Sequence, residues 1–432
     1  MSSEWEWTRL GDHCLKIGSG ATPTGGKDGY LEHGPFALFR SQNIYNDGFT
    51  PKGLAFIGDE QAKKLDGVTV VAGDVLLNIT GDSVARVCLA PANFLPARVN
   101  QHVAIVRPNP SVFDARFVRY FLASTFQQDL MLGLAAAGAT RNALTKTMIE
   151  GFSVPRPPLS VQNEVADTLA VLDDRIVLLR ETNATLEAIA QALFKSWFVD
   201  FDPVRAKQQG LAPAGMDEAT ADLFPASFED STLGLVPKGW RAGIVADLGV
   251  VVCGKTPPTA EPENYGDEVP FITIPDMHAK LVVTAASRSL SRLGADSQRK
   301  KYLPPGSICV SCIATPGLVV RVTSESQTNQ QINSVVPHPA WGKAFPLFLL
   351  RRIGGSGGSV FHNLSKSGFE ALGVLLADVK VVEGFDELVE PLVEKITANQ
   401  TQTQTLATLR DTLLPRLISG QLRLPQAEAL VA

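Results

Sequence analysis

The sequence predicts an α+β protein in which two similar mixed domains are joined by two long helices that form an antiparallel coiled-coil spacer. One heptad frame occurs twice in the chain, at a constant offset of 220 residues. Short segments that precede the first heptad run recur before the second. Between them, short β-branched and apolar runs alternate with Gly, Pro and Asn, which is typical of strands and turns. We therefore expect five parts in order: a domain at 1–158, a helix at 159–200, a linker at 201–238, a domain at 239–380, and a helix with its tail at 381–432.

Each helix carries a run of mostly apolar residues that step alternately by four and three positions. The first run is Val165, Leu169, Leu172, Ile176, Leu179, Asn183, Leu186, Ala190 and Leu193. The second run is Phe385, Val389, Leu392, Ile396, Asn399, Thr403, Leu406, Arg410 and Leu413. A period of about 3.5 residues sustained over this length predicts a coiled-coil seam. The alternative, two unrelated amphipathic helices that pack on their own domains, does not explain the shared frame.

Two asparagines interrupt this apolar seam. An antiparallel register that matches the two runs gives the pairs Val165–Leu413, Leu179–Asn399, Asn183–Ile396 and Leu193–Phe385. A buried Asn costs stability but penalises a shifted register, which would leave its amide unpaired. We therefore hypothesise that Asn183 and Asn399 fix the register, the alternative being that both side chains turn outward to water.

The segments before the two helices match with small gaps. The matching pairs are 7–12 with 240–247, 22–23 with 256–257, 35–36 with 270–271, 73–77 with 306–310, 100–103 with 329–332, and 142–146 with 362–366. Strands are predicted at 68–71, 75–79, 103–106, 308–313 and 319–322, and short helices at 117–124 and 345–352. The linker contains several Pro and Gly residues and many acids, and it has no steady period. We expect it to be an ordered but irregular connector.

Charge is distributed unevenly along the 432 residues. The net charge is −5 overall, but it is +1 for residues 1–160, −7 for 161–239, +3 for 240–383 and −2 for 384–432. The domain-sized blocks are therefore neutral to mildly basic, which leaves room for a nucleic-acid-binding face on each. The sequence contains no apolar run long enough for a membrane span and only five cysteines, and residues 1–10 are not a secretory signal. These features predict a cytoplasmic protein without disulfides.

Three motifs at the ends of these parts carry a resemblance to a known family. Residues 193–205 (LFKSWFVDFDPVR) and 413–422 (LLPRLISGQL) resemble the ends of the two spacer helices of type I restriction-modification specificity subunits. Residues 233–240 (LGLVPKGW) resemble the start of the second recognition domain of that family. The resemblance covers the whole chain, and the order of the parts agrees.

The resemblance implies a DNA-binding role without catalysis by this chain. Each domain would be a target recognition domain that reads half of an asymmetric, interrupted site in double-stranded DNA. The helices would set the gap between the halves and bind two methyltransferase subunits, which methylate adenine N6. Two motor-nuclease subunits would cut unmethylated DNA. The family implies no cofactor on this chain and places S-adenosylmethionine, ATP and Mg on the partner subunits.

The segment Gly249–Thr256 fits the phosphate-binding pattern G-x-x-x-x-G-K-T. A phosphate-binding loop needs a helix that begins at its Lys-Thr pair, but Pro257 and Pro258 follow immediately. The Val250–Val252 run favours a strand. We expect a strand that ends in a surface loop, with Lys255 contacting a DNA phosphate; a P-loop enzyme that uses Lys255 is the alternative.

Other catalytic or metal-binding patterns are incomplete. Cys309 and Cys312 form a single C-x-x-C pair, whereas a structural zinc site needs four ligands. The loop that forms the adenine pocket of a methyltransferase is missing, and the six histidines form no readable triad. We therefore expect no catalytic residue and no metal site, and we keep a coiled-coil scaffold that binds no DNA as a further alternative.

Bases in the major groove are read by polar and cationic side chains on exposed loops. The candidates at predicted strand ends are Arg40, Gln42, Asn43, Asn78, Arg86, Arg141, Asn142, Lys146, Lys255, Asp276, His278, Ser311, Arg321, His362, Asn363 and Lys366. Asn100-Gln101 and Asn329-Gln330 recur in both halves, which makes them framework rather than readers, because two halves of an asymmetric site differ in sequence. Residues 165–193 would span about 43 Å, close to one turn of B-DNA at about 34–36 Å.

Overall fold

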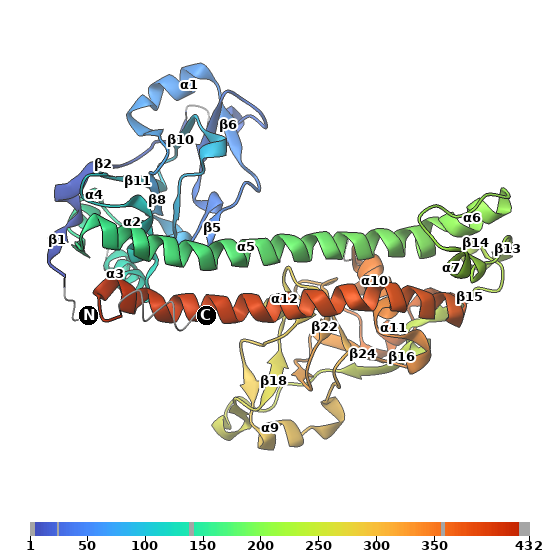
Figure 1. Ribbon diagram of the computed structural model, residues 1–432. Helices are drawn as coiled ribbons and strands as arrows, with labels where there is room; N and C mark the ends of the chain where they lie inside the picture. The colour runs from blue at the N-terminus through green and yellow to red at the C-terminus, as the bar shows by residue number, and fades with distance from the viewer. Residues whose placement is uncertain (1–4, 24–25, 138–141, 356–358, 423–432) are drawn as a thin grey trace. The chain divides into compact units, whose positions relative to one another are not determined.

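The computed structural model describes residues 5–23, 26–137, 142–355 and 359–422. The chain forms two compact units, one from Met1–Val177 with Gln404–Ala432 and one from Leu178–Thr403. Each unit contains one mixed domain and one stretch of each of two long helices, α5 (Leu159–Lys195) and α12 (Val379–Ser419) (Figure 1). Within the described residues, no helix combines the length and the apolar character that crossing a membrane requires.

The first domain is built from a central sheet, a second sheet and a short two-stranded ladder. The central sheet has the order β2 (Cys14–Ser19), β11 (Val103–Pro108), β8 (Val75–Asn78), β9 (Val87–Leu89). The second has the order β6 (Ala55–Ile57), β3 (Phe36–Phe39), β10 (Ala97–Val99), β7 (Thr69–Val70). β1 (Trp7–Arg9) pairs with β12 (Ser153–Pro155). The helices are α1 (Asp59–Lys64), α2 (Ala115–Ala123), α3 (Thr125–Ala136) and α4 (Lys146–Glu150).

Side chains of β8 alternate between two hydrophobic cores, as the period of a strand requires. Val75 and Leu77 pack in the core that includes α2 and the helix residues Leu169 and Leu413. Leu76 lies on the other face, in the core shared with the second sheet. The central sheet is therefore covered on both faces, by helices on one side and by strands on the other.

The second domain repeats this plan. Its central sheet has the order β16 (Gly249–Cys253), β24 (Ile332–Pro337), β21 (Ile308–Ser311), β22 (Val319–Val322), β19 (Val282–Val283). Its second sheet has the order β17 (Tyr265–Gly266), β20 (Ser289–Leu290), β18 (Val269–Ile272), β23 (Gln327–Thr328), and β15 (Arg241–Ile244) pairs with β25 (Gly373–Leu376). The helices are α8 (Ile274–Met277), α9 (Arg292–Asp296), α10 (Ala344–Gly355) and α11 (Lys366–Glu370).

The duplication read from the sequence is confirmed by strand pairing. β2, β11, β8 and β9 occupy the places of β16, β24, β21 and β22, and both sets pair antiparallel. Each second sheet contains one parallel pair at the same place, β3 with β10 and β18 with β23. The two domains therefore share the arrangement of their central strands and differ in their edge strands.

The two long helices lie side by side and run antiparallel within each unit (Figure 1). In the first unit, residues near the start of α5 share a core with residues near the end of α12. In the second, Phe194 near the end of α5 lies 5.8 Å from Phe385 near the start of α12, measured between ring centroids. Eleven seam residues are buried: Val165, Leu169, Leu172, Ile176, Leu179, Ala190, Phe385, Val389, Ile396, Asn399 and Leu413. Asn183, Leu186, Leu193, Leu392, Thr403, Leu406 and Arg410 are half-buried.

The connector after α5 is more regular than the sequence predicts. A single π-turn over Ser196–Asp200 and a left-handed Phe201 (φ 56°) end the helix. α6 (Asp202–Gln208), α7 (Glu218–Asp222) and the hairpin of β13 (Phe228–Ser231) with β14 (Gly234–Pro237) follow. The connector is ordered, as expected, but it contains more regular structure than expected, because its elements are too short to show a period and are held by buried side chains such as Trp197 and Phe224.

Candidate nucleic-acid interface

Polar side chains of the first domain meet where β8 ends and β11 begins. We call this set the first polar edge: Gln42, Asn78, Thr80, Gln101, His102 and Asn142. Asn78 donates through Nδ2 to the carbonyl oxygen of Ser41 (2.9 Å), which places the loop with Gln42 beside the end of β8. His102 contacts Thr80 (2.5 Å) and Gln101 (2.9 Å) through its two ring nitrogens. The segment with Asn142 joins them, because its carbonyl accepts from the amide of Gly81 (3.2 Å).

The second domain has its counterpart at the end of β21. We call this set the second polar edge: Thr256, Ser311, Gln330, Gln331 and Asn363. Thr256 donates to Oε1 of Gln330 (2.6 Å), and the amide of Asn363 donates to the carbonyl of Cys312 (2.7 Å). The amide of Cys312 donates to the carbonyl of Gln331 (2.9 Å), as the amide of Ile79 does to His102 (2.9 Å). The two edges therefore lie at the same place in the repeat but present different side chains.

Asn100 and Asn329 hold the same turn in both domains. Oδ1 of Asn100 accepts from the amide of His102, and Oδ1 of Asn329 accepts from the amide of Gln331, both at 3.1 Å. This equivalence supports the interpretation of both asparagines as framework, because each side chain satisfies backbone at the start of a strand.

The structure places the predicted DNA-contacting residues in four groups. Those with exposed side chains are Gln42, Asn142, Lys146, Lys255, His278, His362, Asn363 and Lys366. Arg40 and Arg86 are half-buried, and their guanidinium groups lie over the rings of Tyr30 (5.0 Å) and Tyr45 (4.7 Å). Asn43, Asn78, Asp276, Ser311 and Arg321 are buried. Arg141 lies outside the described residues.

The sequence predicts that Asn43 and Asn78 of the first domain contact DNA, but both are buried. Asn43 accepts from the amide of Arg40 (3.2 Å) and donates to the carbonyl of Thr50 (2.9 Å), so it shapes the loop that carries Gln42. Asn78 is fully buried and supports the same loop through Ser41. Both side chains therefore serve the fold, and Asn78 is a buried support of the first polar edge, not part of its exposed surface.

The three buried residues of the second domain also have partners within the protein. Ser311 donates to the carbonyl of Thr315 (2.5 Å) and accepts from the amide of Leu318 (2.9 Å). Burial opposes ionisation of Asp276, but hydrogen bonds from Ser287 and Thr273 outweigh it and lower the pKa of Asp276. The third, Arg321, forms an ion pair with Glu390 of α12 (2.6 Å). Sequence patterns marked these residues because strand ends are polar, but they do not show which side chains fold inward.

A basic run missed by the sequence interpretation lies next to Lys255. Arg299–Lys301 follow Gln298, whose side chain donates to the carbonyl of Lys255 (2.8 Å). Lys255 and Lys300 are exposed and Lys301 is half-buried. Three consecutive basic residues are a visible signal, but a search confined to segments repeated in both halves passes over them.

Comparisons with known proteins identify the family. Residues 2–188 and 237–395 match the family described as type I restriction modification DNA specificity domain. The chain belongs to this family. It is 34% identical to the type I restriction enzyme HindI specificity subunit of Haemophilus influenzae, over 97% of this chain and 100% of that protein. It is 26% identical to the MjaIX specificity subunit of Methanocaldococcus jannaschii, over 77% of this chain and 74% of that protein.

A solved structure is similar in fold. The type I restriction-modification S subunit of M. genitalium covers 96% of this chain and 99% of its own, with a TM-score of 0.56 at 15% identity. The family match and the HindI relative place the chain among type I specificity subunits, the DNA-recognising and non-catalytic subunits of such systems, and the solved structure shows a similar fold.

In this specificity subunit, the P-loop-like pattern is part of a sheet. Gly249–Cys253 form strand β16, and no helix begins at Lys255. The amides of Gly254 and Lys255 donate to the carbonyls of Ile332 (3.0 Å) and Thr328 (2.9 Å), so neither is free to bind phosphate. A Cβ on Gly254 would lie 2.0 Å from the carbonyl oxygen of Asn329, so close backbone packing explains the glycine.

The C-x-x-C pair lies within the core of the second domain. Cys309 and Cys312 are buried on β21 and just after it, and both are free thiols. Burial raises the pKa of Cys309 to about 12, so its thiol stays protonated near neutral pH. Among the residues with described coordinates, no three His, Cys, Asp or Glu side chains gather as metal ligands would.

Proposed function

We propose that this specificity subunit reads a bipartite, asymmetric DNA site, one half with each polar edge, and directs adenine N6 methylation to it. The observation that carries the proposal is the duplication itself. The two domains share the arrangement of their central strands and one Asn-based turn, yet they place Gln42, Thr80 and Asn142 at one edge and Thr256, Gln331 and Asn363 at the other. One fold with two different sets of donors and acceptors suits two different half-sites.

Surface cations would supply the part of the affinity that does not depend on sequence. The exposed Lys255 and Lys300 and the half-buried Lys301 lie near the second polar edge and suit DNA phosphates. Half-buried and buried members of each edge fix the loops, so we assign direct contacts to Gln42, Asn142, Lys255 and Asn363, which are exposed.

The helices and partners complete the proposal. We propose that α5 and α12 set the gap between the half-sites and bind two methyltransferase subunits, with two motor-nuclease subunits joining to cut unmethylated DNA. S-adenosylmethionine, ATP and Mg would be bound by these partners. The relatives' names as specificity subunits of type I restriction enzymes support this division of labour.

A domain exchange tests the proposal. Residues 240–380 are replaced by the matching domain of a related specificity subunit, and the complex with its methyltransferase subunits is assayed for methylated sites. One half-site should change and the other should stay. A change in both halves would contradict separate readers, and a chain that binds no DNA in either form would favour the scaffold alternative. ATP binding by the isolated chain would favour the P-loop alternative.

A further inference from the structure

The helix pair is joined to the first domain by a three-way ion cluster centred on Asp173 of α5. Oδ2 of Asp173 accepts from Nη1 of Arg119 (3.0 Å) and from the hydroxyl of Tyr120 (2.8 Å), both on α2. Oδ1 accepts from Nη1 of Arg410 on α12 (2.8 Å). The side chains of Arg119, Asp173 and Arg410 are 8%, 19% and 18% exposed. One carboxylate therefore connects the domain with both helices of its unit.

Arg119 continues this connection into the domain. Its second terminal nitrogen donates to the carbonyl of Asn46, in the turn between β4 (Ile44–Tyr45) and β5 (Gly48–Phe49). Asn46 also accepts from the amide of Val87 (2.9 Å). This hairpin follows directly on the loop that carries Gln42, and Arg86 lies over the ring of Tyr45. The ion cluster thus ends beside the first polar edge.

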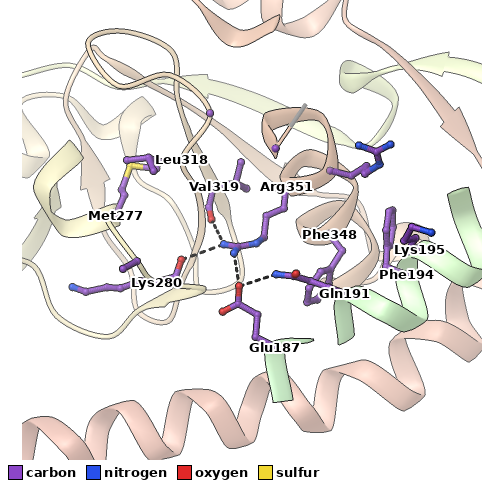
Figure 2. A pocket seen from close by; sticks show the side chains of 14 residues that line it. Glu187, Gln191, Phe194, Lys195, Met277, Lys280, Leu318, Val319, Phe348 and Arg351 are labelled. Atoms are coloured by element: carbon purple, nitrogen blue, oxygen red, sulfur yellow. Dashed lines mark hydrogen bonds and ion pairs between the residues drawn. The ribbon is translucent and has the colours of Figure 1, made fainter. Parts of the chain in front are cut away.

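The second unit uses the same arrangement with other residues. Nη1 of Arg321 on β22 donates to both carboxylate oxygens of Glu390 on α12, at 2.8 and 2.6 Å. Arg351 of α10 binds the carboxylate of Glu187 on α5 and the carbonyls of Lys280 (3.2 Å) and Val319 (2.9 Å), as Figure 2 shows. In both units an acid on a long helix binds an arginine of the domain, and in the first unit α12 adds Arg410.

Removal of only one partner from these ion pairs is costly. A buried ion pair adds little stability in itself, but removal of one partner leaves an uncompensated charge, so the arrangement penalises any other orientation. The hydrogen bonds from Nη1 of Arg321 to Glu390 join two charged groups, and bonds of this kind are stronger than those between neutral groups. Such contacts are suited to orient a domain on a helix pair.

We propose that Asp173 and Glu390 are positioning residues, each of which orients one polar edge on the helix pair and thereby sets the accuracy of one half-site. This inference rests on the proposed function. It requires that loss of either acid relaxes reading by its own domain without affecting the other.

The test uses the complete chain in complex with its methyltransferase subunits. Methylation rates are measured on DNA duplexes that carry single base changes in either half-site. Asp173→Asn should reduce discrimination in the half-site of the first domain by about tenfold, the order expected for loss of one charged hydrogen bond. Glu390→Gln should do the same for the half-site of the second domain. Each variant should leave the other half-site unchanged.

Arg410→Gln is the matched control. It removes a helix partner of Asp173 but leaves Arg119 and Tyr120 in place, so it should lower the melting temperature and keep discrimination in both half-sites. If Asp173→Asn does not fold, Arg119→Lys gives the test, because a lysine cannot bind Asp173 and the Asn46 carbonyl as a guanidinium does.

Two results would overturn the inference: equal relaxation of both half-sites by each acid variant, or equal relaxation by Arg410→Gln and Asp173→Asn. A wild-type complex that methylates no bipartite site would instead overturn the proposed function, so the two failures are distinguishable.

Discussion

Asn399 on α12 donates through Nδ2 to Oδ1 of Asn183 on α5, with 2.9 Å between the two atoms. Asn183 donates in turn through Nδ2 to the carbonyl of Ile396 (3.3 Å). Only 2% of Asn399 is exposed, so the alternative that both side chains turn outward to water is wrong. The bonds join residues in the register that the heptad frames predict, and a shift by one heptad would break both of them.

Replacement of these asparagines separates stability from register. Either single change, Asn183→Leu or Asn399→Leu, leaves a polar amide without its partner and should cost about 1–3 kcal/mol. The double change replaces both by apolar side chains and should raise the melting temperature above that of the wild type, while the gap between half-sites becomes less strict. Thermal unfolding and methylation of duplexes with altered gaps measure both effects. A double variant that melts lower, or keeps an equally strict gap, rules out the register role.

The cations beside the second polar edge should act through phosphates. Lys255→Ala, Lys300→Ala and Lys301→Ala should each weaken DNA binding across all sequences. Each should also reduce the slope of log affinity against log salt by about 1. Titrations at several salt concentrations measure this slope. Lys238→Ala, an exposed lysine at the end of the β13–β14 hairpin, is the control. If none of the three variants changes the slope of log affinity against log salt, these cations do not contact DNA phosphates.

Glycines at one place in the repeat should be intolerant of a side chain. A Cβ on Gly20 would lie 1.7 Å from the carbonyl oxygen of Val99, as one on Gly254 would lie 2.0 Å from that of Asn329. Gly20→Ala and Gly254→Ala should each destabilise the protein by about 1–3 kcal/mol. Gly373→Ala is the control, because nothing lies within 4 Å of its Cβ position. Urea unfolding measures the stability of the three variants. An equal loss of stability in Gly373→Ala would refute the packing explanation.

Removal of one heptad from α5, together with the facing heptad of α12, tests the helices as a spacer. Seven residues correspond to about 10 Å, or roughly three base pairs at ~3.4 Å each. The gap should change or binding should be lost, and the bases read should stay the same. Sequencing of methylated sites checks this, and changed bases with an unchanged gap would count against the spacer.

Patterns that depend on periodicity could be predicted from the sequence. The heptad frames place Asn183 opposite Ile396, and the repeated segments anticipate two domains of one topology. Strand pairing order could not be predicted, because it depends on contacts between distant residues. The parallel pairing of β3 with β10 leaves no local signal.

The candidate site was only partly predictable for a physical reason. A polar residue at a strand end can stand on the surface, as Gln42 does, or fold inward to satisfy backbone, as Asn43 does one position later. The two residues are adjacent polar amides, so residue type alone does not distinguish them. Arg321 shows the same limit, because its partner Glu390 lies 69 residues further along the chain.

The most direct test of the account is a map of methylated adenines in host DNA with and without this gene. We expect methylated adenines within one bipartite, asymmetric motif in the first case, and loss of methylation at that motif in the second. An identical methylation map in both strains, with the methyltransferase subunits expressed, would contradict the account.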